Sequence, residues 1–172
     1  MNLTHEANNY GQSLSAYIEN FKLPRQWFEH ADHIAVKAAN AQHYERLIAQ
    51  FKPQSQEIYE SELNDRRIAT AFLAGPIAVA SQWQVSLLEI MEPRPAMIGR
   101  DKVGLDHMEF FYPDLVAIED RLEVIAGIIP VPQPKPGHNT LSIIFGKQNE
   151  LKFTDRRLAD VIRAERQTTN RQ

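Results

Sequence analysis

Two histidines occupy similar positions in two similar segments of the sequence. His33 lies in the run Asp32-His33-Ile34, and His107 lies in the run Asp106-His107-Met108. Each run opens a stretch typical of a strand and precedes a segment typical of a capped helix. If pseudo-symmetry relates the two segments, we expect the two imidazoles to face each other across a cavity. A strand histidine is more often a surface or hydrogen-bonded residue than a ligand, so the pattern leaves both interpretations open.

Carboxylates on the predicted strands could complete a metal site with these histidines. Glu89 lies on the last strand of the first half, and Glu150 and Lys152 lie on the last strand of the second half. Two imidazoles and one carboxylate suit a divalent metal of borderline hardness, which makes Zn, Fe(II), Mn and Ni the candidate ions. Adjacent strand residues point to opposite faces, so we expect Asp32 and Asp106 to face solvent or a turn.

The composition excludes several other classes of site and protein. The 172 residues include no cysteine, so thiolate metal ligands and disulfides are excluded. The formal net charge is −3, which does not favour nucleic acid as a partner. We see no signal peptide and no apolar stretch near the roughly 18 residues that cross a bilayer. We therefore expect a cytoplasmic protein with no membrane association. The oligomeric state is left open between monomer and homodimer, and the expected partner is a small-molecule ligand.

The elements of the first half follow from apolar periodicity and helix caps. Helical spacing predicts a helix over 8–21 and a short helix from Pro24 towards Phe28, and Asn40 is expected to cap a helix over 41–51. Apolar or alternating runs predict four strands, at 32–37, 57–63, 67–74 and 83–90. We expect Gly75-Pro76 to end the third of these strands.

The pattern restarts in the second half, after a linker marked by Pro93, Pro95 and Gly99. Asp114 is expected to cap a helix, and Asp155 is expected to cap the final helix. Strands are predicted at 106–111, 140–145 and 150–154. The stretch 130–137 holds four prolines, which predicts a rigid loop or a poor edge strand.

Together these elements predict an α+β fold. We expect paired βαβββ modules that form a curved mixed sheet around a cavity, with an N-terminal helical extension and a C-terminal helix. In a single domain the parts would be the extension 1–31, the first module 32–92, the linker 93–105, the second module 106–154 and the C-terminal helix 155–172.

Four runs of the sequence resemble the YecM-like family of bacterial proteins. They are Asp32-His33-Ile34-Ala35-Val36-Lys37, Trp83-Gln84-Val85-Ser86-Leu87-Leu88-Glu89 followed by Pro93, Asp106-His107-Met108-Glu109, and Leu151-Lys152-Phe153. The resemblance covers most of the chain. That family is similar to the vicinal oxygen chelate superfamily, which includes glyoxalase I, bleomycin-resistance proteins and extradiol dioxygenases. The resemblance implies paired βαβββ modules and a metal site, but no particular reaction.

The superfamily's ligand pattern of His, Glu, His, Glu implies a ligand set for this sequence. His33, Glu89 and His107 match the first three positions. The fourth position falls near Lys152, and a protonated lysine cannot be a ligand. Either Glu150, on the same strand face, replaces it, or the site has three protein ligands.

One class of function is a divalent-metal-dependent isomerase, lyase or oxygenase that acts on a small oxygen-rich molecule. Glu89 or Glu109 would be the general base, and Lys152 would hold a substrate oxygen or act as a base. Without metal, we expect Lys152 to pair with Glu89 or Glu109. Arg66 or Arg67 would bind a substrate carboxylate, unless both lie in a surface turn.

The alternative class is a non-catalytic small-molecule binding module that needs no metal. Such a module would place aromatic side chains around its ligand, with Trp83, Phe111 and Tyr112 as the candidates. The same aromatics could instead belong to the core. Whether the protein is an enzyme is left open by the sequence.

Overall fold

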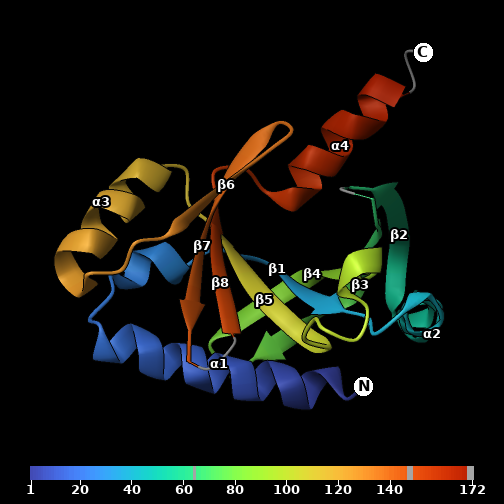
Figure 1. The fold of residues 1–172 in the computed structure, drawn as a ribbon, viewed down its shortest axis with the longest axis horizontal. Helices are drawn as coiled ribbons and strands as arrows, with labels where there is room; N and C mark the ends of the chain where they lie inside the picture. The colour runs from blue at the N-terminus through green and yellow to red at the C-terminus, as the bar shows by residue number, and fades with distance from the viewer. Residues whose placement is uncertain (64, 147–148, 170–172) are drawn as a thin grey trace. The chain divides into compact units, whose positions relative to one another are not determined.

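The computed structural model describes residues 1–63, 65–146 and 149–169, and Figure 1 labels its helices and strands. The chain divides into two compact units. The first unit consists of Met1–Gln12 and His33–His107, and the second of Ser13–Asp32 and Met108–Gln172. The α+β class is confirmed, because each unit combines helices with strands.

The first unit contains the start of α1 (Leu3–Asn20) and most of the first module. After β1 (Ala31–Lys37) come α2 (Ala41–Phe51), β2 (Ser55–Glu62), β3 (Arg67–Val79), β4 (Trp83–Met91) and the start of β5 (Gly104–Phe111). Its strands follow the order β2-β3-β4-β1. The pair β1–β4 is parallel and the other two pairs are antiparallel, so the sheet is mixed, as predicted.

Helix α2 covers one face of this sheet. Asn40 caps the helix as predicted, because its Oδ1 accepts the backbone N–H of His43 at 2.8 Å. Arg67, at the start of β3, reaches α2, where its guanidinium lies 4.6 Å from the centre of the Tyr44 ring. Strand alternation then places Ile90 on this covered face and Glu89 on the opposite one.

Strand β3 is longer than the sequence pattern predicts. It continues through Gly75-Pro76 to Val79, so the prediction that these two residues end the strand is wrong. The register against β4 shifts between Phe72 and Ile77. Gly75 and Pro76 lie in this irregular stretch, where the missing N–H of proline costs no ladder hydrogen bond.

The second unit repeats the strand order of the first. It contains the rest of α1, a short 3-10 helix (Arg25–Phe28), the end of β5, α3 (Leu115–Ala126), β6 (Val131–Lys135), β7 (His138–Phe145), β8 (Asn149–Thr154) and α4 (Leu158–Thr169). The order β5-β8-β7-β6 corresponds to β1-β4-β3-β2. Each module is therefore a βαβββ unit, as predicted.

Of the two helix caps predicted in the second unit, one is found and one is not. Asp114 caps α3 as predicted, through Ala117 N–H at 3.0 Å. Asp155 does not cap α4, because its carboxylate accepts hydrogen bonds from the backbone and side chain of Asn139. The Oδ2 atom of Asp32 instead accepts Leu158 N–H at 3.1 Å. The proline-rich β6 is an edge strand, where proline is tolerated.

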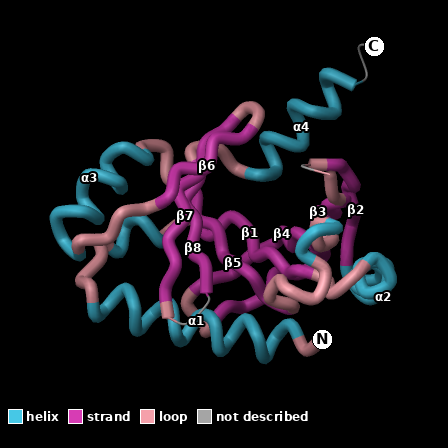
Figure 2. Tube along the Cα trace, in the orientation of Figure 1, coloured by secondary structure: helices cyan, strands magenta, loops and turns pink. Residues whose placement is uncertain are grey.

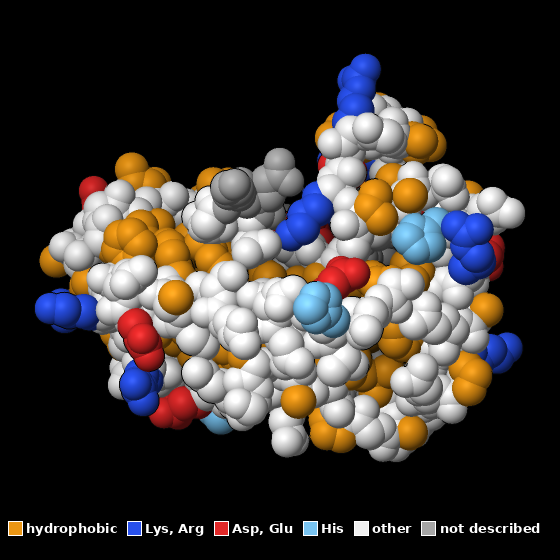
Figure 3. Space-filling view, turned by 90° about the horizontal axis from the view of Figure 1, so that it is seen from below, with side chains coloured by type: hydrophobic (Ala, Val, Ile, Leu, Met, Phe, Trp, Pro, Cys, Tyr) orange, Lys and Arg blue, Asp and Glu red, His pale blue; other side chains and the backbone are white. Residues whose placement is uncertain are grey.

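Figure 2 distinguishes the helices from the strands. Among the residues the structure describes, none of the helices combines the length and apolar character needed to cross a membrane. Figure 3 shows the side chains of one face coloured by type.

Candidate metal centre

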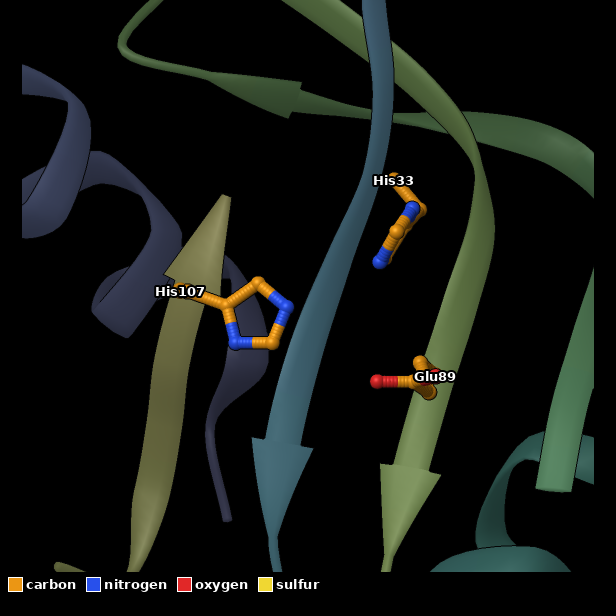
Figure 4. Close-up of side chains that lie close together, drawn as sticks. All are labelled: His33, Glu89 and His107. Atoms are coloured by element: carbon orange, nitrogen blue, oxygen red, sulfur yellow. The ribbon is translucent and has the colours of Figure 1, made fainter. Parts of the chain in front are cut away.

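Three of the predicted ligands come together within the first unit. His33 projects from β1, Glu89 from β4 and His107 from β5, and Figure 4 shows the three side chains pointing towards a common space. One ligand atom from each residue lies within 4.8 Å of those of the other two. The two imidazole rings are 5.7 Å apart between centroids and are nearly perpendicular.

The register of the parallel pair β1–β4 explains this arrangement. Ala35 lies opposite Glu89, so Glu89 and His33 share a face of the sheet and are offset by two residues along it. Both histidines are 2% exposed, and Glu89 is half-buried. Strand alternation therefore aims a carboxylate and an imidazole at the same space, away from the face that α2 covers.

The donor set fits a divalent metal ion. Ligands that each lie 2.0–2.2 Å from one ion are at most about 4.4 Å apart. The separation of the three donor atoms, within 4.8 Å of one another, is of this order. Two neutral imidazoles and one carboxylate are the donors that Zn, Fe(II), Mn and Ni accept.

A buried ion-pair network adjoins His107. The Nδ1 atom of His107 lies 2.9 Å from Oδ2 of Asp106, and Nζ of Lys37 lies 3.0 Å from Oδ1 of the same carboxylate. Asp106 is 6% exposed, so the expectation that it faces solvent or a turn is wrong. Asp32, beside the start of α4, is also buried. Asp106 has one partner on its own strand and one on β1, and Asp32 has a partner at the start of α4. Alternation within one strand cannot reveal the partners that come from another element.

This network controls the charge of Asp106. Burial alone would raise the pKa of the Asp106 carboxyl. The hydrogen bond from His107 and the positive charges of His107 and Lys37 outweigh burial and hold that pKa well below its usual range. Asp106 is therefore a carboxylate at neutral pH and only accepts hydrogen bonds.

Comparison with protein families identifies the chain. The model of the YecM protein family matches residues 1–164. The chain belongs to the YecM family. The search of curated proteins gave no match for it.

Comparison with solved structures shows which proteins have a fold similar to that of this YecM-family protein. A structural-genomics structure called Protein EC4020 is 22% identical, with a TM-score of 0.76, and the match covers 95% of this chain and 91% of that one. A methylmalonyl-CoA epimerase from Streptomyces coelicolor is 14% identical, with a TM-score of 0.53 and coverage of 73% and 95%. Glyoxalase I from Zea mays is 14% identical, with a TM-score of 0.52 and coverage of 75% and 43%. At these identities the likeness shows that the chain shares its fold with these proteins.

Three further predicted site residues of this YecM-family protein lie in the second unit: Glu109, Glu150 and Lys152. Lys152 Nζ is 3.7 Å from Oε1 of Glu150, two residues earlier on β8, and Lys135 Nζ is 3.8 Å from Oε2 of Glu109. We predicted that Lys152 pairs with Glu89 or Glu109, whereas the pair found for its ammonium group is with Glu150. Alternation correctly placed Lys152 and Glu150 on one face, but it could not show that the nearer carboxylate on the same strand would be the partner.

Glu150, the predicted fourth ligand, has polar partners of its own. Its Oε1 accepts a hydrogen bond from the Ser142 hydroxyl, and the Gln133 side-chain amide is 3.5 Å away. As a fourth ligand, Glu150 would exchange some of these contacts for a metal ion. Its role in ligation remains a prediction.

In the structure, Arg67 forms ion pairs with two carboxylates of the protein itself. Its guanidinium pairs with Glu92 at 3.0 Å and with Glu45 at 2.6 Å. Arg67 therefore has carboxylate partners within the protein, and the binding of a substrate carboxylate by Arg66 or Arg67 remains a prediction. Phe111 likewise has a partner, because the Arg157 guanidinium lies 4.7 Å from its ring centre.

A cavity of about 440 Å³ lies in the second unit. It is bounded by the start of α3 and by residues of β6 and β7, including Leu115, Val116, Pro132 and Leu141. None of the three predicted aromatics of the binding-module alternative lines it. Sequence reasoning missed this cavity, because its walls come from a helix start and an edge hairpin that carry no ligand motif.

Proposed function

We propose that this YecM-family protein binds a divalent metal ion through His33, Glu89 and His107. The observation that supports it is the approach of these three donor atoms, from three different strands, to within 4.8 Å of one another. Three protein ligands leave coordination positions open for a small molecule, as in catalytic metal sites.

The function we propose is that of a metal-dependent isomerase, lyase or oxygenase acting on a small oxygen-rich molecule. A bound divalent ion supplies Lewis acidity, which polarises an oxygen atom of that molecule. The side chains of His33, Glu89 and His107 would hold the ion. Glu109 and Lys152 are the proposed acid–base groups, and Glu150 is the proposed fourth ligand.

The structural neighbours support the small-molecule class and do not identify a substrate. The epimerase neighbour was solved in complex with 2-nitronate-propionyl-CoA. That ligand carries oxygen atoms that a metal ion or polar side chains can hold. By analogy, we propose a compact carboxylate, carbonyl or nitronate-like compound for this chain.

The test is metal binding by protein purified without a histidine tag. Elemental analysis and calorimetric titration with Zn(II), Mn(II), Ni(II) and anaerobic Fe(II) should find one ion per chain. The variants His33→Gln, Glu89→Gln and His107→Gln should each weaken binding by more than the roughly 10–100-fold typical of losing an outer partner. His5→Gln, an exposed histidine on α1, is the matched control and should bind as the wild type does. Equal affinity in all four variants would rule out this site.

The cavity of the second unit favours a second candidate function, the metal-free binding of a small molecule. Its volume of about 440 Å³ falls in the range of ligand pockets, and its walls combine apolar and polar residues. A thermal-shift screen of small carboxylic acids and amides in the presence of a chelator would test this function. A bulky substitution in the cavity, Leu115→Trp, should abolish any shift that depends on it.

A further inference from the structure

The carboxylate of Asp106 uses a different oxygen atom for each of its two partners. Oδ2 lies 2.9 Å from Nδ1 of His107, and Oδ1 lies 3.0 Å from Nζ of Lys37. The three side chains come from β1 and β5 within the first unit, and the His107 and Asp106 side chains are 2% and 9% exposed. The result is a linear chain of contacts, Lys37–Asp106–His107, that ends on one of the proposed metal ligands.

We propose that Lys37 and Asp106 are positioning residues that fix the tautomer of His107 for a metal ion. This inference rests on the proposed function. An ionised carboxylate only accepts hydrogen bonds, so the Nδ1 atom of His107 must carry the proton. In the neutral ring the lone pair is then on Nε2, which becomes the metal-binding atom. A carboxylate behind a ligating histidine also makes that histidine a stronger donor.

Lys37 determines which way Asp106 faces. An ammonium group only donates hydrogen bonds, so it always requires an acceptor oxygen. By occupying Oδ1, Lys37 holds the carboxylate plane so that Oδ2 faces the imidazole. The cation also compensates the negative charge of a carboxylate that is almost completely buried.

This geometry predicts an unusual effect of the nearly isosteric change Asp106→Asn. Lys37 would still require an acceptor and would take the single oxygen of the new amide. The NH₂ group of that amide would then face Nδ1 of His107 and donate to it. His107 would have to carry its proton on Nε2, the nitrogen proposed to bind the metal, and its lone pair would point away from the site.

Removing the lysine should reverse this effect. In the double variant Lys37→Met with Asp106→Asn, the amide is free to turn its oxygen towards Nδ1 of His107. The Nδ1–H tautomer should return, and metal affinity should return with it. A role of Asp106 in folding alone would not be restored by a second substitution that removes its ion-pair partner.

The experiment measures the His107 tautomer and the metal affinity separately. Long-range ¹H–¹⁵N correlation spectra of the metal-free protein, at a pH where the ring is neutral, report which nitrogen carries the proton. We expect Nδ1–H in the wild type, Nε2–H in Asp106→Asn and Nδ1–H in the double variant. Calorimetry with Zn(II) should show affinity about 10–100-fold weaker in Asp106→Asn. If the two substitutions acted independently, their losses of binding free energy would add. The double variant should bind Zn(II) at least about 10-fold more tightly than that sum predicts.

Two variants outside the Lys37–Asp106–His107 network serve as controls. Asp101→Asn and Lys52→Met, the same substitutions outside the network, should leave the tautomer and affinity unchanged. An Nε2–H tautomer in the wild type, or an Asp106→Asn variant with unchanged tautomer and affinity, would overturn the inference. If the wild type binds none of the tested metals, the proposed function fails, and the tautomers of the metal-free variants still determine whether Lys37 and Asp106 orient His107.

Discussion

Arg67 shows how packing decides whether a charged residue serves function or structure. Its sequence context, a predicted turn followed by a strand, allowed it to be a substrate-binding arginine. In the structure its guanidinium lies over Tyr44 and pairs with two glutamates, Glu45 and Glu92. These partners come from α2 and from the residue that follows β4, and a local sequence pattern cannot show that the two are close to Arg67.

The Arg67–Glu92 pair predicts a pH-dependent contribution to stability. The hydrogen bond from Arg67 lowers the pKa of Glu92, in spite of its partial burial. The contribution is therefore fully present above the unfolded pKa near 4.5 and is lost as the pH falls through the lower folded value. Glu92→Gln should cost about 0.5–1 kcal/mol at neutral pH, and this cost should fall towards zero as the pH falls through the lowered pKa of Glu92.

Denaturant unfolding of the wild type and Glu92→Gln across this pH range measures the difference. Glu123→Gln, an exposed carboxylate on α3, is the control and should show no such pH dependence. A Glu92→Gln difference that persists unchanged at the acid end would mean that the loss arises from packing and not from the charge of Glu92.

At the same scale, the proposed ligands were predictable and their supporting residues were not. The repeated Asp-His runs and strand alternation are local features, and they identified His33, Glu89 and His107. The roles of Asp106 and Lys37 depend on which strand of the sheet neighbours which. That depends on long-range pairing, so alternation led to the wrong expectation that Asp106 faces solvent or a turn.

At the scale of elements, helix α1 contains a glycine whose replacement should reverse the usual helix preference. A Cβ atom on Gly11 would lie 2.6 Å from Cβ of Ala80 and 2.8 Å from Cγ1 of Val79. Alanine in a helix is ordinarily favoured over glycine by about 1 kcal/mol. Here the overlap should outweigh that gain, and Gly11→Ala should destabilise the protein by about 1–3 kcal/mol.

Gly75→Ala in the irregular stretch of β3 provides the contrast. A Cβ atom there would have no neighbour within 4 Å, so this variant should be neutral or about 0.5 kcal/mol more stable. Thermal unfolding of the two variants side by side tests both expectations. A stabilised Gly11→Ala would show that α1 can shift away from the turn at Ala80 without loss.

The start of α4 depends on a residue that precedes it by more than a hundred positions. Oδ2 of Asp32 accepts the first N–H of the helix, and a carboxylate there also interacts favourably with the helix dipole. Asp32→Ala should cost about 1 kcal/mol at this end of α4. Hydrogen exchange at the first turn of α4 should then become about five-fold faster.

Asp32→Asn is the matched variant, because asparagine accepts the same hydrogen bond. It should keep most of the protection, and the rest of the second unit should exchange as in the wild type. Equal exchange in Asp32→Ala and the wild type would mean that α4 does not depend on this cap. The sequence predicted a cap for α4 but assigned it to Asp155, because a cap supplied from a distant strand leaves no local signal.

At the scale of the whole molecule, the repeat of the βαβββ module was the most predictable feature. Each module is defined by short-range patterns of helix caps and strands, and both follow the same strand order. The boundaries of the compact units were not predictable in this way. They fall inside α1, β1 and β5, so continuous elements contribute to both units.

Because all three proposed ligands belong to the first unit, metal binding should stabilise that unit in particular. At a free metal concentration about 100-fold above the dissociation constant, binding contributes about 2.7 kcal/mol to stability. Hydrogen exchange with and without Zn(II) should show new protection in β1, β4 and β5, and a chelator should remove it. The His33→Gln variant should lose this protection, whereas His5→Gln should keep it.

Additional protection in β8 would support Glu150 as the fourth ligand. Protection confined to residues 113–119, beside the cavity of the second unit, would instead contradict the proposed metal centre.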